Sequence, residues 1–242
     1  MMVSATLHFL SNLERYDSEK PYFLNIAGNE SSPAIIQNNL EYAPQDGIEL
    51  LDMRERGFDA FSLEDNGFTV LKYEAAARPE DSDAAMESYC DEIVRLVMKE
   101  CNAVHTICYD YRVLDYEAGQ DTGRKAVAPP VFPAHIDHTV DGGPRRIRRH
   151  LTEEEAETYL NDKFRARIIN VWRPLNGVVE DCPIAICDPR SVDAQRDLVA
   201  ADRVTPNFAV ELYYLRYNPK QTWYWVPDQT PDELTRIADS EE

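Results

Sequence analysis

The segment PAHIDHT, residues 133–139, places two metal-binding types of side chain at positions 135 and 137. In extended backbone, residues two positions apart point to the same side of the chain. His135 and Asp137 therefore present an imidazole nitrogen and a carboxylate oxygen to one point. A His-x-Asp tripeptide is common by chance and, taken alone, is most often a surface or turn feature. The sequence on both sides of the segment therefore decides how it is interpreted.

Upstream of this segment the sequence predicts irregular structure and then one long helix. Residues 1–80 are broken by prolines and a glycine, so we expect short strands or turns there. Between residues 82 and 101 apolar side chains recur at helical spacing, and Ser82 is a typical N-cap. Residues 128–133 are proline-rich and extended, because each proline also restricts the residue before it. We therefore assign residues 1–125 to an N-terminal helical and irregular flank.

Downstream of the segment the sequence has the composition of β-strands. Thr152, followed three residues later by Glu155, predicts a helix that begins with a capping box. Residues 218–221 predict a hairpin turn between the last two strands. We predict one domain, residues 1–242, of mixed α+β class, with a sandwich or jelly-roll core at residues 126–242 and flanking helices. The segments rich in β-branched and aromatic residues are 167–175, 184–188, 210–217 and 222–226.

The composition excludes several classes of partner. The 242 residues are 43% hydrophobic, which is enough for a core, and carry a net charge of -19. Such an acidic surface repels phosphate, so nucleic acid and anionic membranes are poor partners. No apolar run of about 18 residues is present, and residues 1–10 lack the features of a signal peptide. We therefore expect a cytoplasmic protein, with its five cysteines reduced and no structural zinc site.

The order of the predicted elements fits one kind of metal site. A helix, an extended proline-rich lead, a His-x-Asp pair and several strands follow one another as in the double-stranded β-helix (jelly roll) of non-haem iron oxygenases. These enzymes bind Fe(II) through two histidines and one carboxylate on one face of the metal. The opposite face stays open for oxygen and an organic cosubstrate. The sequence therefore favours an iron site at His135 and Asp137.

Further blocks of sequence carry a resemblance that covers nearly the whole chain. Together they resemble the fungal hydroxylase/desaturase family that includes the gibberellin desaturases, whose members are often labelled as similar to the small chain of the cephem 7-methoxylase. The blocks after the His-x-Asp segment are residues 145–148, 167–175, 179–188, 190–192, 213–219, 223–225 and 228–233, and those before it are residues 21–22 and 66–68.

The resemblance implies an oxidoreductase of secondary metabolism, a non-haem iron dioxygenase. Such an enzyme hydroxylates or desaturates a small organic substrate with Fe(II), 2-oxoglutarate and O2. His135 and Asp137 match the family's His-x-Asp and are the expected metal ligands. Asn170, Trp172 and Arg173 match its Asn-Val-Trp-Arg-Pro block, for which the residues themselves give no role.

Two arginines lie among aromatic residues on predicted strands. An arginine that points into an apolar barrel usually needs a carboxylate partner. Arg173 or Arg216 is therefore a candidate for binding 2-oxoglutarate or an acidic group of the substrate. The alternative, which we favour from the sequence, is a structural ion pair with an acid such as Asp181 or Glu211.

The sequence departs from the family pattern after residue 233. In the family the chain continues into strands that bring a distal histidine and an arginine that binds the cosubstrate carboxylate. Here no histidine follows His150, and the only arginine after Arg216 is Arg236. We therefore expect a jelly roll shortened at its C-terminus, with an open sheet edge that favours homo- or hetero-oligomers.

Three readings follow from this departure. The chain is a working oxygenase whose third iron ligand comes from elsewhere, with His8, His105 and His138 as candidates. Alternatively, it is a catalytically inactive or partner-dependent paralogue. The third reading is an incomplete gene model.

Overall fold

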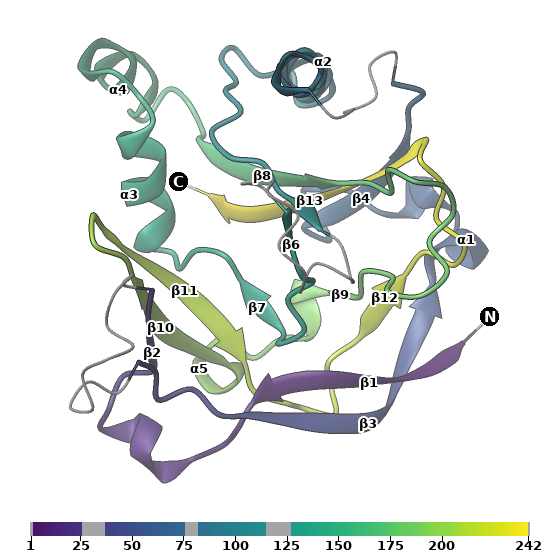
Figure 1. The fold of residues 1–242 in the computed structure, drawn as a ribbon, viewed down its shortest axis with the longest axis vertical. Helices are drawn as coiled ribbons and strands as arrows, with labels where there is room; N and C mark the ends of the chain where they lie inside the picture. The colour runs from purple at the N-terminus through teal and green to yellow at the C-terminus, as the bar shows by residue number, and fades with distance from the viewer. Residues whose placement is uncertain (1, 26–36, 76–81, 115–126, 242) are drawn as a thin grey trace.

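The strands in the described part of the chain form four sheets (Figure 1). The computed structural model describes residues 2–25, 37–75, 82–114 and 127–241. The first sheet has the order β1 (Val3–Leu10), β3 (Tyr42–Asp52), β12 (Trp223–Trp225) and β9 (Ile186–Cys187), and the second has β2 (Tyr22–Leu24), β10 (Leu198–Val204), β11 (Ala209–Leu215) and β7 (His135–Ile136). The third has β4 (Phe68–Lys72), β13 (Glu233–Glu241) and β8 (Arg167–Trp172), and β5 (Val113–Leu114) pairs with β6 (Val127–Ala128).

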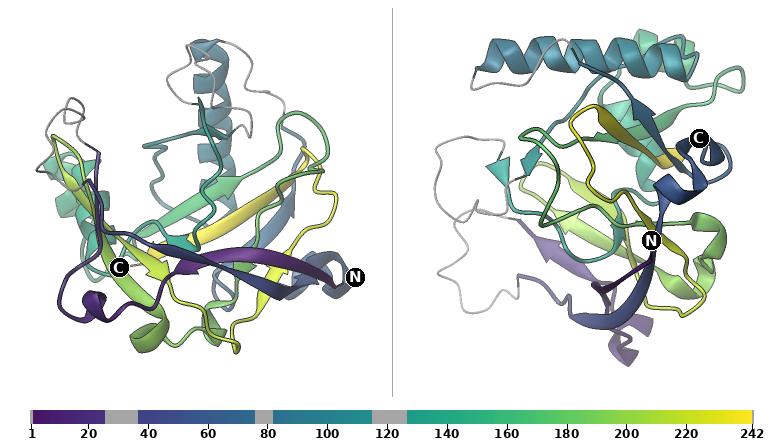
Figure 2. Two further views of the ribbon diagram at one scale, coloured as in Figure 1. Left: turned by 60° about the horizontal axis from the view of Figure 1, so that its bottom comes forward. Right: turned by 90° about the vertical axis from the view of Figure 1, so that its right-hand side faces the viewer.

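Helices flank these sheets, as the sequence predicts. Figures 1 and 2 show α2 outside the sheet formed by β4, β13 and β8, and α3 and α4 together at one side of the molecule. Among the described helices, none combines the length and the apolar character needed to span a bilayer. The α-helices are α1 (Met53–Arg56), α2 (Asp83–Glu100), α3 (Gly142–Arg149), α4 (Glu153–Tyr159) and α5 (Ala194–Asp197), and the 3-10 helices are η1 (Glu14–Asp17), η3 (Phe58–Ala60) and η4 (Pro189–Ser191).

The two predicted helix starts are confirmed by their caps. Ser82 precedes α2, and its side chain accepts a hydrogen bond from the backbone N–H of Ala85. Thr152 precedes α4, and Thr152 and Glu155 exchange the two hydrogen bonds of a capping box. Each cap satisfies backbone donors that have no partner within the first turn of a helix.

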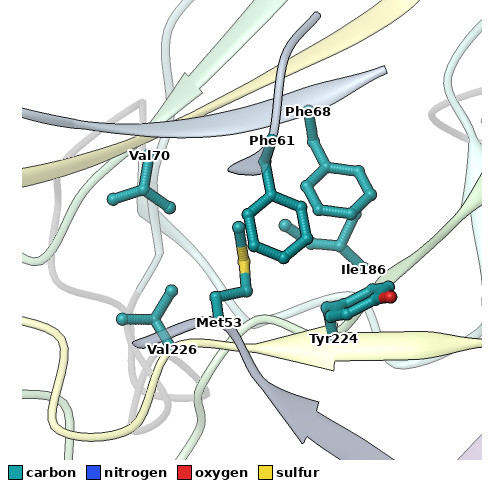
Figure 3. Packing of buried hydrophobic residues seen from close by; sticks show 7 residues of the cluster. All are labelled: Met53, Phe61, Phe68, Val70, Ile186, Tyr224 and Val226. Atoms are coloured by element: carbon teal, nitrogen blue, oxygen red, sulfur yellow. The ribbon is translucent and has the colours of Figure 1, made fainter. Parts of the chain in front are cut away.

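The hydrophobic core consists of two clusters between the sheets. In the first, Phe61 packs against Phe68 and Tyr224, with ring centroids 5.5 and 5.1 Å apart, around a fully buried Met53 (Figure 3). These residues come from α1, β4, β12 and the turn after η3. The second cluster joins β1, β3, β11 and β12 through Phe9, Ile48, Leu50, Leu215 and Trp223.

Residues 1–125, predicted as a helical and irregular flank, contain α2 and also supply strands to all four of the described sheets. β3 pairs with β12, β2 with β10, and β4 with β13. Of the residues that suggest breaks, Pro44 lies within β3 and pairs with β1, while Gly28 lies outside the described residues. Gly47, at φ 76°, lies in a bulge of β3 where the register with β1 shifts.

The predicted hairpin at residues 218–221 is also wrong, although the turn is present. β11 pairs with β10 and β7, whereas β12 pairs with β3 and β9. The turn therefore carries the chain from one sheet to another. Its Asn218 side chain is buried and donates to both carboxylate oxygens of Asp197 at 3.1 Å, which fixes the crossing.

An ion pair between a half-buried arginine and a buried carboxylate ties α1 to the start of β13. The guanidinium of Arg54 donates two hydrogen bonds of 2.6 Å to the carboxylate of Glu233, whose side chain is 4% exposed. Burial alone raises the pKa of Glu233, but the hydrogen bonds from Arg54 and from the backbone of Thr230 outweigh it and lower the pKa below its ordinary value of 4.5. The charged form of Glu233 therefore stabilises the fold.

Glu233→Gln is expected to lower the free energy of unfolding by about 2 kcal/mol at pH 7, because it leaves Arg54 without its countercharge. Since the folded-state pKa of Glu233 is lowered, this contribution is complete above pH 4.5 and is lost as the pH falls below that value. Denaturant unfolding of both proteins at pH 7 and in steps below pH 4.5 measures the difference. The exposed Glu87→Gln on α2 is the control, and a difference that stays constant with pH contradicts the assignment.

Candidate metal centre

The short strand β7 presents His135 and Asp137 to one point. His135 and Ile136 pair with Tyr214 and Tyr213 of β11, and Asp137 follows directly. The His135 Nε2 atom lies 3.4 Å from the Asp137 Oδ1 atom, so the two side chains share one side of the chain, as the spacing predicts. Their side chains are 27% and 48% exposed, so a solvent-borne ion has access to both.

The remaining polar atom of each side chain has its own partner. His135 Nδ1 lies 2.7 Å from the backbone oxygen of Pro133, so Nδ1 carries the proton and Nε2 is the free nitrogen. Asp137 Oδ2 accepts a 3.0 Å hydrogen bond from the side-chain amide of Asn170 on β8, which leaves Oδ1 available. Nε2 and Oδ1 are thus the two atoms that face each other. The hydrogen bonds to Pro133 and from Asn170 hold the two side chains in this orientation.

The two side chains shift each other's pKa. Burial lowers the pKa of His135 and raises that of Asp137, but their mutual attraction, together with the hydrogen bonds of His135 to Pro133 and of Asp137 to Asn170, outweighs burial. The net result is a raised pKa for His135 and a pKa of about 2 for Asp137. The site therefore favours a positive charge between the imidazole and the carboxylate, which is the charge that a bound cation supplies.

The chain after Asp137 is anchored to β11 through Thr139, whose side chain is 1% exposed. Its hydroxyl donates to Glu211 Oε1 at 2.6 Å, and its backbone N–H donates to the Glu211 backbone oxygen at 3.0 Å. The same hydroxyl oxygen accepts from the backbone N–H of Gly142 at 2.9 Å. Since Gly142 is the first residue of α3, this contact docks the helix against the strand beside β7.

Asn170 is the one residue of the predicted weaker set that contacts the His135–Asp137 pair. Trp172 pairs across strands with Thr235, and Arg173 donates to the Pro231 backbone oxygen with its guanidinium carbon 5.6 Å from the Tyr89 ring. Arg216 lines two surface pockets that contain neither His135 nor Asp137. Binding of a cosubstrate or substrate by these residues stays a prediction.

The predicted ion pairs of Arg173 and Arg216 with an acid are not formed within the described residues. Glu211, one of the two proposed acids, instead binds Lys20 and Thr139. The pairing failed because sequence proximity to an arginine does not reveal which strand lies next to the acid. Lys20 is 191 residues away from Glu211 in sequence.

The histidines suggested as a third ligand lie in other surroundings. His105 stacks on Tyr159 at 4.8 Å, the His8 ring lies 6.2 Å from Phe132, and the His138 ring bonds to Asp239. Across residues 2–25, 37–75, 82–114 and 127–241, no group of three or more His, Cys, Asp and Glu side chains is arranged to hold a metal.

Asp239 is the neighbour of the site that sequence reasoning missed. It belongs to a run of acidic residues that suggests an exposed tail. In the structure it lies on β13, its side chain is 3% exposed, and it contacts both Asp137 and His138. No strand pattern in the sequence identifies it, because Leu234 and Ile237 just before it lie three positions apart and so on opposite faces of a strand.

Comparisons with known proteins show the family and the fold of the chain. A family model described as "Oxidoreductase/YMDC permease-like domain" matches residues 7–242. The chain belongs to this family. Solved structures of an iron and alpha-ketoglutarate-dependent endoperoxidase, NvfI, have the same fold as this chain. One of them aligns with a TM-score of 0.84 and 22% sequence identity, and the alignment covers 100% of this chain and 85% of the NvfI chain. The jelly-roll class predicted from the sequence is therefore confirmed.

Curated relatives of this oxidoreductase-family chain are fungal. The alpha-ketoglutarate-dependent dioxygenase phiK of a fungal species is 28% identical over 77% of this chain and 67% of its own length. The Fe(II)/2-oxoglutarate-dependent dioxygenase nvfI of Aspergillus novofumigatus is 28% identical over 85% of this chain and 73% of its own length. The hydroxylase/desaturase CTB9 of Cercospora beticola is 32% identical over 57% of this chain and 45% of its own length. The resemblance to fungal hydroxylase/desaturases is confirmed.

The lengths of these relatives differ from that of the chain. The matches cover 67% of phiK and 65% of the related dioxygenase tstK of Talaromyces stipitatus. The chain thus spans about two thirds of the length of these curated relatives.

Gly142→Ala is expected to destabilise the fold by about 2 kcal/mol, because the new Cβ atom would lie 2.7 Å from the backbone oxygen of Glu211 and 3.0 Å from the Thr139 hydroxyl. Val140→Ala, in the same turn, removes a side chain that is 71% exposed and should change stability by less than about 0.5 kcal/mol. Denaturant unfolding compares the two. Equal stability of the Gly142→Ala and wild-type proteins contradicts the close packing of α3 on β11.

Proposed function

We propose that this chain is an Fe(II)- and 2-oxoglutarate-dependent oxygenase that hydroxylates or desaturates a small organic substrate in secondary metabolism. The observation that carries the proposal is the convergence of His135 Nε2 and Asp137 Oδ1 at 3.4 Å on β7. The pair lies within a fold shared with a solved iron and alpha-ketoglutarate-dependent enzyme. The relatives described as dioxygenases and hydroxylase/desaturases support the same chemistry.

The donor atoms fit ferrous iron. A neutral imidazole nitrogen and a carboxylate oxygen are two of the three protein ligands in the 2-His-1-carboxylate arrangement of non-haem iron oxygenases. Hydrogen bonds from the outer shell hold both ligands, through Pro133 on one side and Asn170 on the other. No thiol takes part in this contact, so the donor set does not favour the softer metals that thiolates select.

Each described residue of the site has a distinct task in this proposal. His135 and Asp137 would hold the iron, which activates O2 for the oxidation of substrate and 2-oxoglutarate. Asn170 holds the carboxylate of Asp137 so that one oxygen faces Nε2, which limits the rotation of Asp137. The solvent access of both ligands leaves room for the cosubstrate to approach.

The overall reaction balances for both outcomes. In hydroxylation, one oxygen atom of O2 enters the substrate as a hydroxyl group, and the other enters succinate as 2-oxoglutarate loses CO2. In desaturation, the substrate loses two hydrogen atoms, which leave as water with the first oxygen atom. Succinate is the common product and reports turnover of either kind.

The expected partners and surroundings follow from the same observations. We propose a small, organic substrate, because the relatives are biosynthetic enzymes, and no nucleic acid, because the net charge is -19. A cytoplasmic location and a homo- or hetero-oligomer that covers an open sheet edge are further proposals. The relatives described as dioxygenases favour an active enzyme over the alternative of an inactive paralogue.

Purified protein with Fe(II), 2-oxoglutarate and O2 is expected to form succinate, at a low rate without substrate and faster with the correct one. His135→Ala should reduce the rate at least about a hundredfold, because it removes one of the metal-binding atoms. Succinate is quantified by mass spectrometry in aerobic and anaerobic reactions.

His105→Ala is the matched control, since its ring stacks on Tyr159 away from β7. It should keep the wild-type rate. Wild-type protein that binds Fe(II) but forms no succinate with any candidate substrate contradicts the proposed activity, and equal rates in the His135 and His105 variants contradict the site.

A further inference from the structure

One carboxylate, that of Asp239 on β13, binds two consecutive residues of the His-x-Asp segment. Its Oδ1 atom accepts a 2.8 Å hydrogen bond from the backbone N–H of Asp137, and its Oδ2 atom bonds to Nδ1 of His138. Both oxygens are therefore engaged with the segment. Asp239 lies more than a hundred residues along the chain from Asp137, and its strand belongs to a different sheet from β7.

Water has little access to this contact. The side chain of His138 is 7% exposed and that of Asp239 is 3% exposed. A buried polar group that loses its partner incurs its full desolvation cost, since water cannot replace the hydrogen bond. The position of β13 is therefore coupled to the backbone of Asp137.

The backbone pairing of β7 cannot supply this restraint. β7 pairs with β11 at only His135 and Ile136, and the pairing stops before Asp137. Two residues after Asp137, Thr139 is held by a hydrogen bond to Glu211. Between these two anchors, the hydrogen bond from Asp137 N–H to Asp239 fixes the residue that carries the carboxylate.

We propose that Asp239 is a positioning residue for the metal centre: it sets the backbone of Asp137 and thereby aims its carboxylate at the point that His135 Nε2 faces. This inference rests on the proposed function. Asp239 acts through Asp137 and His138 and is not itself a ligand, because both of its oxygens are bonded to the segment. Asn170 restrains the carboxylate end of Asp137, and Asp239 restrains its backbone end.

The test is Fe(II) binding by anaerobic calorimetry to the metal-free protein. Asp239→Ala is expected to weaken Fe(II) binding about 10–100-fold, the range found when groups that orient metal ligands are removed. Asp239→Asn keeps an acceptor for the Asp137 N–H and should lose less. His138→Gln leaves that hydrogen bond intact and should also lose less than Asp239→Ala.

Asp197→Asn is the matched control. The side chain of Asp197 is as buried as that of Asp239, and it accepts hydrogen bonds from Asn218, Gln221 and the backbone of Asp193, none of which belongs to the His-x-Asp segment. It should lower thermal stability and leave Fe(II) affinity within about twofold of wild type. A general effect of losing a buried carboxylate would instead weaken binding in both variants.

A second measurement is independent of iron. Amide hydrogen exchange of metal-free protein should be faster in the peptide that covers residues 135–141 in Asp239→Ala, and unchanged there in Asp197→Asn. The exchange measurement tests the positioning role even if Asp239→Ala is less stable. Asp239→Asn and His138→Gln should each increase exchange at residues 135–141 by less than Asp239→Ala does.

The outcomes separate this inference from the proposed function. If wild-type protein binds no Fe(II), both fail. If wild type binds Fe(II) and His135→Ala does not, but Asp239→Ala binds as wild type does, the iron site stands and the positioning role is overturned. Unchanged exchange at residues 135–141 in Asp239→Ala overturns it as well.

Discussion

The geometry of the site depends on holding a carboxylate that lies just beyond a two-residue strand. β7 pairs with β11 at His135 and Ile136 alone, so the ladder ends before Asp137. Asp137 is held by side chains of another sheet, Asn170 on β8 and Asp239 on β13, and Thr139 after it is held by the side chain and backbone of Glu211 on β11. A strand with so few ladder bonds would otherwise be free to twist or slip. The protein thus uses polar side-chain contacts beyond the end of the backbone pairing, and the contact of Asp239 with His138 is costly to break because both side chains are buried.

The local features of the sequence predicted local structure well. The spacing of His135 and Asp137 placed both side chains on one side, and Ser82, Thr152 and Glu155 marked helix starts that the structure confirms. These predictions depend only on neighbours a few residues apart. The strands of residues 1–125 were harder to predict for the opposite reason: β2, β3 and β4 pair with β10, β12 and β13, which lie far along the chain. The predicted hairpin was wrong because the sequence of a turn does not reveal whether the strands on its two sides pair with each other.

The site shows the same division between near and distant information. Asn170 belongs to a block that the sequence singled out, yet its task became visible only when β8 was placed beside β7. Asp239 was hidden by its acidic neighbours, since a charged run normally lies in solvent. Arg173 and Arg216, for which the sequence favoured a structural ion pair over binding of a cosubstrate, have other surroundings: the Arg173 guanidinium lies over the Tyr89 ring, and Arg216 lines surface pockets. Residue type therefore indicated which atoms are suited to bind a metal, whereas the groups that contact those residues became apparent only from the three-dimensional arrangement of the strands.

The central place of β13 has a consequence for the order in which the protein matures. This strand lies between β4 and β8, supplies Glu233 to Arg54, and supplies Asp239 to the His-x-Asp segment. A nascent polypeptide that has emerged from the ribosome only as far as β12 holds His135 and Asp137 but lacks all three of these contacts. During synthesis, His135 and Asp137 therefore lack the restraint from Asp239 until β13 has joined its sheet. The arrangement of the proposed site is completed only when the third sheet is assembled.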